Sequence, residues 1–268
     1  MFFPFQKVLV ALSIPALLLC GCAKKSALPT PLPPTYAQSP HLLEEVWKTD
    51  DVDISGVNAD KKLVALTFDD APTQKLNALL DVFLSFNKSH PNCPAYATLF
   101  CNGKSFSRHK ESLYTAFAMG IELGNHAFSH LDLTTLEPDQ LHQEITAMDA
   151  LLEEIDGKQT HLFRAPYGRV NDKVIRAVNV PIIDWYIDTE DWSTRQADIL
   201  VERVFSRLHD GVIVLMHDGY QETVDGVKML LPLLYEQGYQ AVSVSQMAKA
   251  HGCRLQTGKI YTRARKQI

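Results

Sequence analysis

Hydrophobic and polar residues alternate in a regular way along this chain from about residue 60 onward. Short apolar runs are separated by longer segments in which apolar residues recur at helical spacing. Each short apolar run predicts a strand. The predicted strands are 62–68, 95–101, 121–125, 161–164, 181–187, 212–216 and 241–244.

The segments between these strands have the pattern of amphipathic helices. The first helix has one apolar face, made by Leu76, Leu79, Leu80, Phe83 and Leu84. The second begins near Pro138 and ends at Gly157, which suits a C-terminal cap. Two further helices are predicted at about 194–208 and 223–237. Seven strand–helix units predict an α/β fold with a parallel sheet, most simply closed into a barrel.

Length and composition fit one catalytic domain. The chain has 268 residues, 46% hydrophobic and 21% charged, which is enough for one sizeable core. The net charge of −5 gives no reason to expect a nucleic-acid partner. The basic residues collected in 254–266 are explained by a solvated tail, and contact with an anionic cell surface is the alternative.

The N-terminus has the pattern of an export signal. Lys7 precedes an apolar stretch, 8–19, which is short for a bilayer span but has the length of a secretory h-region. The Leu19-Cys20-Gly21-Cys22 sequence resembles the lipobox of bacterial lipoproteins, with Cys22 as the lipidated residue. Acyl chains would then anchor the protein to the membrane on its extracytoplasmic side. An ordinary cleaved signal or a short anchor is the alternative.

Two further segments and three cysteines leave alternatives open. The proline-rich stretch 23–40 predicts an extended stalk, and 41–55 is either a short helix packed on the barrel or more stalk. Cys93 and Cys101 could pair in an oxidising compartment, or Cys101 could be a buried free thiol. Cys253 is left unpaired in either case.

Polar residues with catalytic potential fall where the predicted strands end. Parallel strands bring their carboxyl ends to one face of a barrel, so these residues are expected to form one site. They are Asp69, Asp70, His126, Arg164, Asp188, Asp191, His217 and Asp218. Each alone has a simpler explanation, such as helix capping, a turn or an exposed histidine pair. Their joint occurrence at consecutive strand ends is harder to explain by structure alone.

The residue types indicate hydrolysis. His126 and His130, four apart, would share one face of a helical turn, and with a carboxylate they could hold a metal that keeps a position open for water. The second carboxylate of Asp69-Asp70 is then left to act as a base. Two histidines and one carboxylate also suit non-haem Fe(II) oxygenases. The spare acid and base fit hydrolysis better.

The same residues resemble the NodB-type polysaccharide deacetylases, carbohydrate esterase family 4, over about residues 60–250. All five motifs of that family occur in order: Thr67-Phe68-Asp69-Asp70, His126-Ala127-Phe128-Ser129-His130, Arg164-Ala165-Pro166-Tyr167-Gly168, Asp188-Thr189-Glu190-Asp191-Trp192 and Leu215-Met216-His217-Asp218. The resemblance implies a distorted (β/α)7-type barrel with a single catalytic domain.

The resemblance also implies a role for each matching residue. Asp70, His126 and His130 would bind one divalent metal, with zinc expected first and cobalt, nickel or iron as alternatives. Asp69 would be the general base and His217 the general acid, oriented by Arg164 and Asp191 respectively. The backbone N–H of Tyr167 would stabilise the oxyanion. Trp192 and Met216 would line the pocket for the acetyl methyl group.

This chain departs from the family pattern at two positions. The first motif usually continues with glycine where Ala71 stands, and a positive φ there would strain alanine and shift the loop over Asp69. The fifth motif usually has leucine where Met216 stands, a replacement of similar volume.

These features predict an exported, membrane-anchored enzyme that removes acetyl groups from N-acetylhexosamine units of a cell-wall or chitin-like glycan. An O-acetyl esterase acting on xylan and a non-catalytic glycan- or metal-binding lipoprotein are the alternatives. The expected organisation is a signal peptide over 1–22, a proline-rich stalk and connecting segment over 23–60, the deacetylase domain over 61–250 and a basic tail over 251–268.

Overall fold

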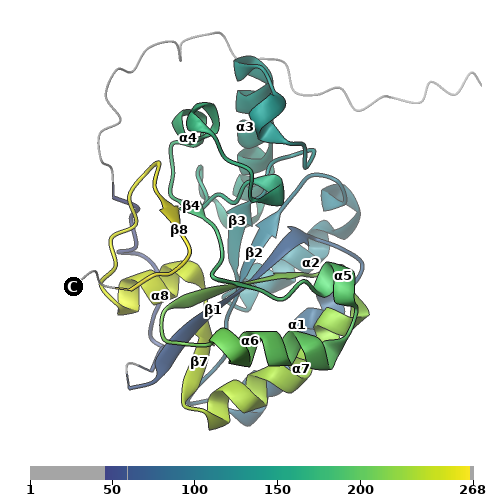
Figure 1. Cartoon of the computed structure of the whole chain (residues 1–268), viewed down its shortest axis with the longest axis vertical. Coiled ribbons are helices and arrows are strands. Elements are labelled where there is room, and N and C mark those ends of the chain that lie inside the picture. The colour runs from purple at the N-terminus through teal and green to yellow at the C-terminus, as the bar shows by residue number, and fades with distance from the viewer. Residues whose placement is uncertain (1–45, 59, 266–268) are drawn as a thin grey trace, which may run out of the picture. The chain divides into compact units, whose positions relative to one another are not determined.

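The computed structural model describes residues 46–58 and 60–265, which form an α/β fold (Figure 1). The strands are β1 (Lys62–Ala71), β2 (Thr98–Cys101), β3 (Glu122–Asn125), β4 (Ile182–Ile183), β5 (Ile187–Asp188), β6 (Val212–His217), β7 (Tyr239–Val242) and β8 (Ile260–Tyr261). The α-helices are α1 (Leu76–Ser89), α2 (Phe106–Ala118), α3 (Pro138–Asp156), α4 (Asp172–Val178), α5 (Asp191–Thr194), α6 (Ala197–Arg207), α7 (Gln221–Glu236) and α8 (Val244–Ala250). Two 3₁₀ turns are η1 (Leu133–Thr135) and η2 (Pro166–Gly168).

The named strands pair in parallel, as predicted. The order of the main sheet is β3-β2-β1-β6-β5, and β7 pairs with the amino-terminal part of β1. Strand β1 therefore lies at the centre, with its carboxyl end between those of β2 and β6. Residues at the ends of these three strands are neighbours even though they are far apart in the sequence.

Isolated bridges close this sheet into a distorted barrel. Phe163 bridges Asn125 on one side and Ile182 in β4 on the other. Strand β4 pairs with β8, and Arg263 beyond β8 forms an antiparallel bridge with Val212 at the start of β6. The predicted strand 161–164 is therefore reduced to a single bridging residue. The closure agrees with the predicted barrel, but short and irregular pairings make up this side of it.

The predicted strand 181–187 is divided because the chain changes hydrogen-bonding partner within it. Asp184 donates its backbone N–H to the carbonyl of Tyr261 in β8, whereas Tyr186 donates to that of Ile213 in β6. The segment thus crosses from one part of the sheet to another and forms β4 and β5. An apolar run alone carries no signal for such a change of partner.

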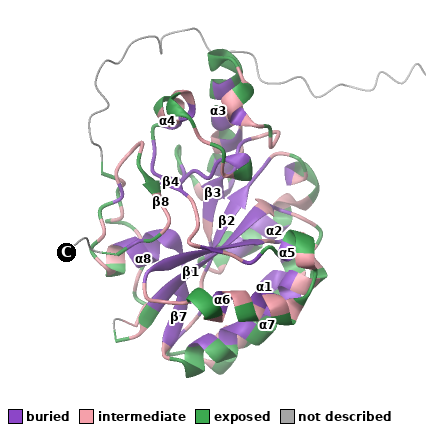
Figure 2. Ribbon diagram, in the orientation of Figure 1, coloured by how far each residue is buried: buried purple, intermediate pink, exposed green. Residues whose placement is uncertain are grey.

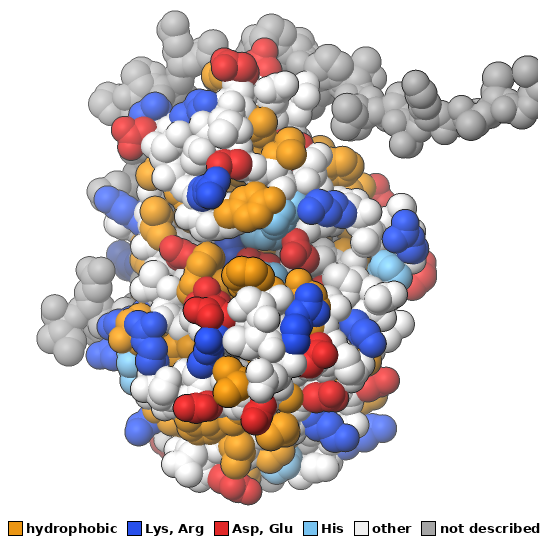
Figure 3. All heavy atoms as spheres, turned by 45° about the vertical axis from the view of Figure 1, so that its right-hand side comes forward, with side chains coloured by type: hydrophobic (Ala, Val, Ile, Leu, Met, Phe, Trp, Pro, Cys, Tyr) orange, Lys and Arg blue, Asp and Glu red, His pale blue; other side chains and the backbone are white. Residues whose placement is uncertain are grey.

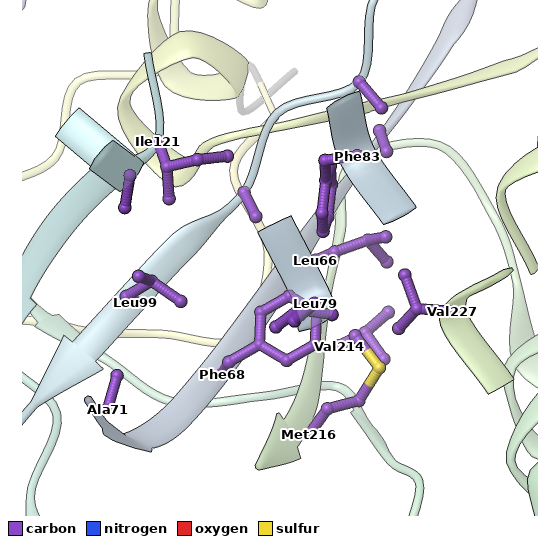
Figure 4. Close-up of a cluster of buried hydrophobic side chains, with 14 of the residues drawn as sticks. Leu66, Phe68, Ala71, Leu79, Phe83, Leu99, Ile121, Val214, Met216 and Val227 are labelled. Carbon is purple, nitrogen blue, oxygen red and sulfur yellow. The ribbon is translucent and has the colours of Figure 1, made fainter. Parts of the chain in front are cut away.

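Side chains of β1 alternate between two cores. Leu66 and Phe68 belong to the cluster between the sheet and helices α1 and α7, whereas Leu63 and Ala65 pack in a second cluster with α8. Figure 4 shows Phe68 and Leu66 next to residues of these helices. The Phe68 ring meets Phe83 of α1 edge-on, with centroids 6.2 Å apart. In Figure 2 the central strands are accordingly buried, and the outer faces of the helices are exposed.

The four predicted helices are confirmed, with boundaries shifted by a few residues. In α3, Pro138 is in the first turn and Gly157 ends the helix at φ 74°, as expected for a left-handed C-cap. The helices α2, α4, α5 and α8 were not predicted. Most of the side chains of α8 are buried, so its sequence lacks the one-sided apolar pattern on which the prediction depended.

The C-terminal segment corrects the expectation of a solvated tail. Residues up to 265 pack on the domain, with Leu255 and Ala264 buried and β8 paired with β4. The basic side chains Arg254, Lys259 and Arg263 are exposed, as is Ile260 of β8, and Tyr261 is half-buried. The many basic residues of this segment had obscured the short strand β8 in the sequence pattern.

The segment before β1 forms no helix in its described part, which starts at residue 46. Trp47 donates its backbone N–H to Leu255, and the Lys249 side chain donates to the carbonyls of Asp50 and Val52. Residues 46–58 therefore contact the domain as an irregular segment with turns at 50–51 and 55–56. The predicted lipidation site, Cys22, and the export signal lie outside the described residues.

The three described cysteines, Cys93, Cys101 and Cys253, are free thiols, so the alternative of a disulfide between the first two is not realised. Within the described ranges, none of the helices combines the length and the hydropathy needed to cross a membrane.

A buried ion triad outside the strand ends stabilises the packing of α3. His161 donates or accepts at both ring nitrogens, with Nδ1 2.8 Å from Asp149 Oδ1 and Nε2 3.2 Å from Asp156 Oδ1. Burial opposes the charged imidazole, but the two carboxylates outweigh it and raise the pKa of His161. The imidazolium thus links the last two turns of α3 to the segment that leads to Arg164.

This triad predicts stability that declines with rising pH. A raised folded-state pKa stabilises the fold fully below the unfolded pKa of about 6.5, and this contribution is lost as the pH rises through the folded-state pKa. His161→Gln should lower the free energy of unfolding by about 3 kcal/mol at pH 6, because two buried carboxylates lose their cation. Urea unfolding from pH 6 to pH 9 should show the difference shrinking. His109→Gln on α2 is the control, and a difference independent of pH for His161→Gln would contradict the prediction.

Candidate active site

A β-bulge at the end of β1 brings two consecutive acids to one site. Asp69 pairs with Phe100, and Ala71 pairs with Cys101, so Asp70 has no partner in the register. Its φ of 67° is left-handed, which Asp tolerates better than most residues. In a regular strand the two carboxylates would point to opposite faces. The extra residue re-aims the second one.

The strain expected at Ala71 is absent. The left-handed residue of this loop is Asp70, and Ala71 is not among the residues with positive φ. Ala71 is completely buried in the cluster between the sheet and helices α1 and α7 (Figure 4). Its carbonyl accepts the backbone N–H of Asn102. Alanine therefore continues the strand pairing without a conformational cost.

Asp70, His126 and His130 form one cluster of candidate metal ligands. One nitrogen or oxygen atom from each lies within 4.8 Å of the others, and this is the one such group among the described residues. Asp70 Oδ1 is 3.4 Å from His130 Nε2, and the two imidazole rings are 5.0 Å apart. The Asn102 amide donates to Asp70 Oδ1 at 2.7 Å and orients that carboxylate.

Both histidines are in a state suited to metal binding. His126 Nδ1 is 2.8 Å from the Arg164 carbonyl, which can only accept, so Nδ1 carries a proton and Nε2 is the ring nitrogen that is available to the site. Burial and then the neighbouring His126 lower the pKa of His130, which favours a neutral ring. One carboxylate and two imidazoles are a donor set that fits a divalent transition metal, and hydrogen bonds orient Asp70 and His126, whereas the buried Nδ1 of His130 has no hydrogen-bond partner among the described residues.

The loop that carries these histidines is not a helical turn, contrary to expectation. Ala127 and His130 have φ of 59° and 54°, and the segment between them is extended or bent. Helix α3 holds it: Ser129 donates its N–H to the Glu144 side chain at 2.6 Å. Asn125 accepts from Ala127 N–H and donates to the carbonyl of Ile145 in α3. The four-residue spacing of the two histidines, which suggested a helix, thus belongs to a loop that tertiary hydrogen bonds hold in place.

Asp69 is ionised by contact with Arg164. The Arg164 Nη1 lies 2.7 Å from Asp69 Oδ1 and 2.8 Å from the Thr67 hydroxyl. Arg164 is 1% exposed, and Asp69 is 4% exposed. Burial opposes the charge on Asp69, but the Arg164 guanidinium beside it holds its pKa below the ordinary value. Asp69 is also 3.5 Å from His126.

Arg164 keeps its position through backbone acceptors. Its Nε donates to the carbonyl of Ile183, its Nη2 donates to that of Asp184, and the guanidinium stacks 4.2 Å from the Phe100 ring centroid. The crossing of the chain from β4 to β5 supplies both carbonyls. The irregular side of the barrel therefore holds the buried cation.

His217 lies directly beside Asp69, because the two residues are partners in the register of β6 and β1. Its Nδ1 is 2.8 Å from Asp191 Oδ1. Asp191 also accepts from the His217 backbone N–H and from the Thr223 hydroxyl, at 2.8 and 2.6 Å. Burial opposes the imidazolium, but the hydrogen bond and charge of Asp191, followed by the charge of Asp69, raise the pKa of His217 to about 8.

The aromatic residues predicted to meet substrate are open to solvent. Tyr167 is 61% exposed and Trp192 is 53% exposed, so both rings can be reached by a large ligand. Tyr167 has φ 62° and packs its ring against His130, with centroids 4.7 Å apart. In Figure 3, red and pale blue side chains gather in a hollow of this face and are flanked by orange and blue ones.

The structure corrects the prediction that Met216 lines the acetyl pocket. Met216 is completely buried and points away from the site into the cluster between the sheet and helices α1 and α7, next to Val214 and Val227 (Figure 4). Side chains alternate along β6, so Leu215 and His217 share the opposite face. Leu215, 4% exposed, is thus the residue of this motif that lies with His217 on the side of the site.

Several residues of the site were missed in the sequence. Asn102 follows the end of β2, the same signal that identified the other site residues, and it could have been found in this way. Thr67, Glu144 and Thr223 carried no signal, because each acts through a contact between distant segments.

Two acids of the motifs serve the loops rather than the centre. Asp188 accepts the N–H of Glu190 at 2.8 Å, as a turn residue does. Asp218 is fully buried and accepts the N–H of Thr73 in the loop after β1 at 2.9 Å. Burial raises the pKa of Asp218 to about 7.

Fold and site together define a class: an α/β barrel protein with a centre of two histidines and one carboxylate, next to a paired base and acid. The family model described as "Polysaccharide deacetylase" matches residues 56–180. The chain belongs to this family, carbohydrate esterase family 4, and the resemblance recognised in the motifs is confirmed.

Three relatives illustrate the match. The peptidoglycan-N-acetylmuramic acid deacetylase PdaC of Bacillus subtilis is 34% identical over 192 residues, which cover 71% of this chain and 40% of PdaC. Its crystal structure superposes with a TM-score of 0.67 at 33% identity, over 72% of this chain and 93% of that one. The peptidoglycan-N-acetylglucosamine deacetylase PgdA of Listeria monocytogenes is 32% identical over 201 residues, 75% of this chain and 41% of PgdA.

The third relative carries a metal. A family 4 acetyl xylan esterase from Clostridium thermocellum, in complex with a cobalt ion, has a TM-score of 0.69 at 25% identity, over 75% of this chain and 98% of that one. The chain spans about two fifths of the length of PdaC and PgdA.

Proposed function

We propose that this chain is a metal-dependent hydrolase that removes acetyl groups from N-acetylhexosamine units of an extracytoplasmic polysaccharide, such as peptidoglycan or a chitin-like glycan. One observation carries the proposal. An ionised buried carboxylate, Asp69, lies directly opposite a protonated histidine, His217, beside three candidate metal ligands. A site that only bound metal or glycan would need neither a spare base nor an acid.

Asp70, His126 and His130 would hold the metal, and Asn102 and the Arg164 carbonyl would orient two of these ligands. A bound divalent ion supplies Lewis acidity, which makes water more acidic and polarises a carbonyl group. Zinc is the metal we propose, and cobalt, nickel and iron accept the same ligands. The cobalt ion in the acetyl xylan esterase supports a divalent metal at this type of site.

Asp69 acts as the general base in this proposal. Its carboxylate is held in the ionised form by Arg164, so it can accept a proton from the water that attacks the acetyl carbon. Because Arg164 also bonds to Thr67, the carboxylate cannot rotate freely away from the site. Arg164 is thus a positioning residue.

His217 acts as the general acid. A pKa of about 8 keeps its ring protonated near neutral pH, and Asp191 fixes Nδ1 so that Nε2 can donate the proton to the departing amine nitrogen. Asp69 and His217 are opposite each other on neighbouring strands, so one substrate group can contact both. Asp191 is itself fixed by Thr223.

The backbone N–H of Tyr167 donates to the carbonyl oxygen as that oxygen becomes negative, which is worth on the order of 10²–10³ in rate for each such donor. Trp192 supplies an apolar wall for the substrate. Leu215 takes the place that we had assigned to Met216 in the acetyl pocket.

We further propose that the enzyme acts on the cell wall, anchored by a lipid on Cys22 and separated from the membrane by the stalk within 23–60. The lipobox-like sequence supports the anchor, and the similarity to the peptidoglycan deacetylases PdaC and PgdA supports a peptidoglycan substrate.

Acetate release by the full-length protein tests this function. The protein is stripped of metal, reloaded with zinc or cobalt, and given N-acetylglucosamine oligomers, peptidoglycan and acetylated xylan. Metal-dependent release from the amide substrates is the expected result. Release from xylan alone would make the protein an O-acetyl esterase, and no release from any substrate despite bound metal would favour a binding protein.

The protonated state of His217 predicts a pH profile. The value of kcat/KM should fall as the pH rises through about 8, because the general acid loses its proton. In Asp191→Asn the fall should move to lower pH, since the hydrogen bond and charge that raise the pKa of His217 are weakened. Glu190→Gln, which changes an exposed acid bonded to Arg203, should leave the profile in place. An unchanged alkaline fall in Asp191→Asn would exclude His217 as the titrating group.

A further inference from the structure

Beside the candidate active site, one arginine is fixed in place without an anionic partner. Arg195 follows α5, is exposed, and donates its Nε to the carbonyl of Trp192 at 2.9 Å. Its guanidinium carbon lies 3.4 Å from the centroid of the Tyr220 ring. These two contacts hold the planar group while its Nη atoms donate to no carboxylate in the described part of the chain.

This guanidinium is at the rim of the catalytic centre. The Tyr220 ring on which it stacks is 6.1 Å from the His217 ring, so one aromatic ring separates the cation from the proposed general acid. The exposed Trp192, whose carbonyl fixes Arg195, directly follows Asp191, which binds His217. Arg195, Trp192 and Tyr220 therefore form an open rim of two aromatic rings and one cation.

The other cations near the site are engaged or loosely held. Arg203 pairs with Glu190 at 2.8 Å, and Arg169 pairs with Asp132 at 2.7 Å. Lys75 donates to Gln221. Lys104 is exposed and acts on His130, on the other side of the centre, but a lysine side chain has no planar fork for two parallel hydrogen bonds.

We propose that Arg195 is a specificity residue that binds the carboxylate of an acidic N-acetylhexosamine, as in the lactyl ether of muramic acid, while the sugar ring packs on Trp192. This inference rests on the proposed function and narrows its substrate class. A guanidinium with free Nη donors matches a carboxylate by two parallel hydrogen bonds, and its stacking on Tyr220 removes much of the rotational freedom that binding would otherwise cost. A neutral chitin-like glycan offers this group no anion.

The test compares substrates that differ in one functional group. The full-length protein is given peptide-free glycan strands of alternating N-acetylglucosamine and N-acetylmuramic acid, the same strands with the lactyl carboxylate reduced to an alcohol, and N-acetylglucosamine oligomers. Arg195→Gln should lower kcat/KM on the native strands by about tenfold, typical of one charge-assisted contact at a partly exposed site. It should leave the reduced strands and the neutral oligomers almost unchanged.

Arg207→Gln is the matched control. Arg207 stacks on Tyr186 in the same manner, at 4.6 Å, but it is in the last turn of α6, which leads to the amino end of β6. His217 is at the opposite end of that strand. Arg207→Gln should leave kcat/KM unchanged on all three substrates.

A binding measurement separates this inference from the proposed catalysis. Calorimetry with the Asp69→Asn variant, which should not turn over substrate, should show about tenfold weaker binding of reduced strands than of native strands. The additional Arg195→Gln substitution should abolish that difference. The inference would be overturned if Arg195→Gln lowered kcat/KM equally on all three substrates, or if the protein showed no preference for the carboxylate. A preference that Lys104→Gln removed and Arg195→Gln retained would also overturn it. Absence of turnover together with carboxylate-dependent binding would overturn the proposed function alone.

Discussion

Replacing Asp69 with asparagine is expected to lower acetate release by about 10³–10⁴-fold and to leave the bound metal in place. The amide has the size of the carboxylate but cannot accept the proton of the attacking water, and general-base catalysis contributes about 10²–10⁴ in rate. The candidate metal ligands Asp70, His126 and His130 are untouched. Retained metal with lost turnover is therefore the signature of a base that is not a ligand.

The fold should survive this change because Arg164 keeps other acceptors. Its guanidinium donates to Thr67 and to the carbonyls of Ile183 and Asp184, so the buried charge is not left without partners. Some stability is lost, since breaking a buried ion pair commonly costs about 3–5 kcal/mol. Thermal unfolding of the variant should therefore be measured with its activity.

Three measurements decide this prediction: acetate release, metal content by mass spectrometry, and the unfolding midpoint. Asp188→Asn is the matched control, because Asp188 is also an acid at a strand end but accepts a hydrogen bond only from the Glu190 N–H. The control should release acetate almost as the unmodified protein does. If Asp69→Asn also kept its activity, Asp69 would not be the base, and another group would have to take the proton.

Replacing His126 with alanine is expected to remove both metal and activity. The residue is 1% exposed and its Nδ1 is anchored to the Arg164 carbonyl, so its removal leaves one ligand position of the cluster without a donor. Loss of a partner that only orients a ligand costs about 10–100-fold in metal affinity, and loss of the ligand itself should exceed this. Activity should fall to that of the metal-stripped protein.

Asn102→Ala gives a graded comparison. It removes the hydrogen bond to Asp70 and the acceptor of the Lys104 backbone N–H but no metal ligand, so the metal affinity should fall by about 10–100-fold and activity should return when metal is added in excess. His209→Ala, which removes a half-buried histidine packed on Tyr186, is the control for the loss of an imidazole elsewhere. Zinc titration monitored by calorimetry measures all three variants. Normal zinc affinity in His126→Ala would place the metal elsewhere.

The sequence predicted the parallel α/β barrel and most of the site because both follow from local patterns. The apolar runs predicted the strands of the central sheet, and most of the polar residues at their ends meet in space, whereas Asp188 and Asp218 hold loops instead. This works because parallel strands must bring their carboxyl ends to one face, so the position of a residue along its own strand already determines on which face of the barrel it lies.

Several features depended on contacts that no local pattern contains. Periodicity suggested a helical turn for the two histidines, but hydrogen bonds from α3 hold them in a loop with left-handed residues. The strand face of Met216 was misjudged, since an apolar residue suits either the core or an acetyl pocket. The basic segment at the C-terminus was read as solvated, yet its few apolar residues complete the barrel through β8.

The sequence by itself determined the order of the elements and the chemical groups available at the strand ends. Tertiary structure decided how those groups are aimed: the bulge that turns Asp70 toward the histidines, the carbonyls that fix Arg164, and the stacking of Arg195 on Tyr220. The physical reason is the distance along the chain over which each interaction acts. Periodicity and turn chemistry act within a few residues, whereas each of these orientations results from hydrogen bonds or packing between segments that only the closed barrel brings together.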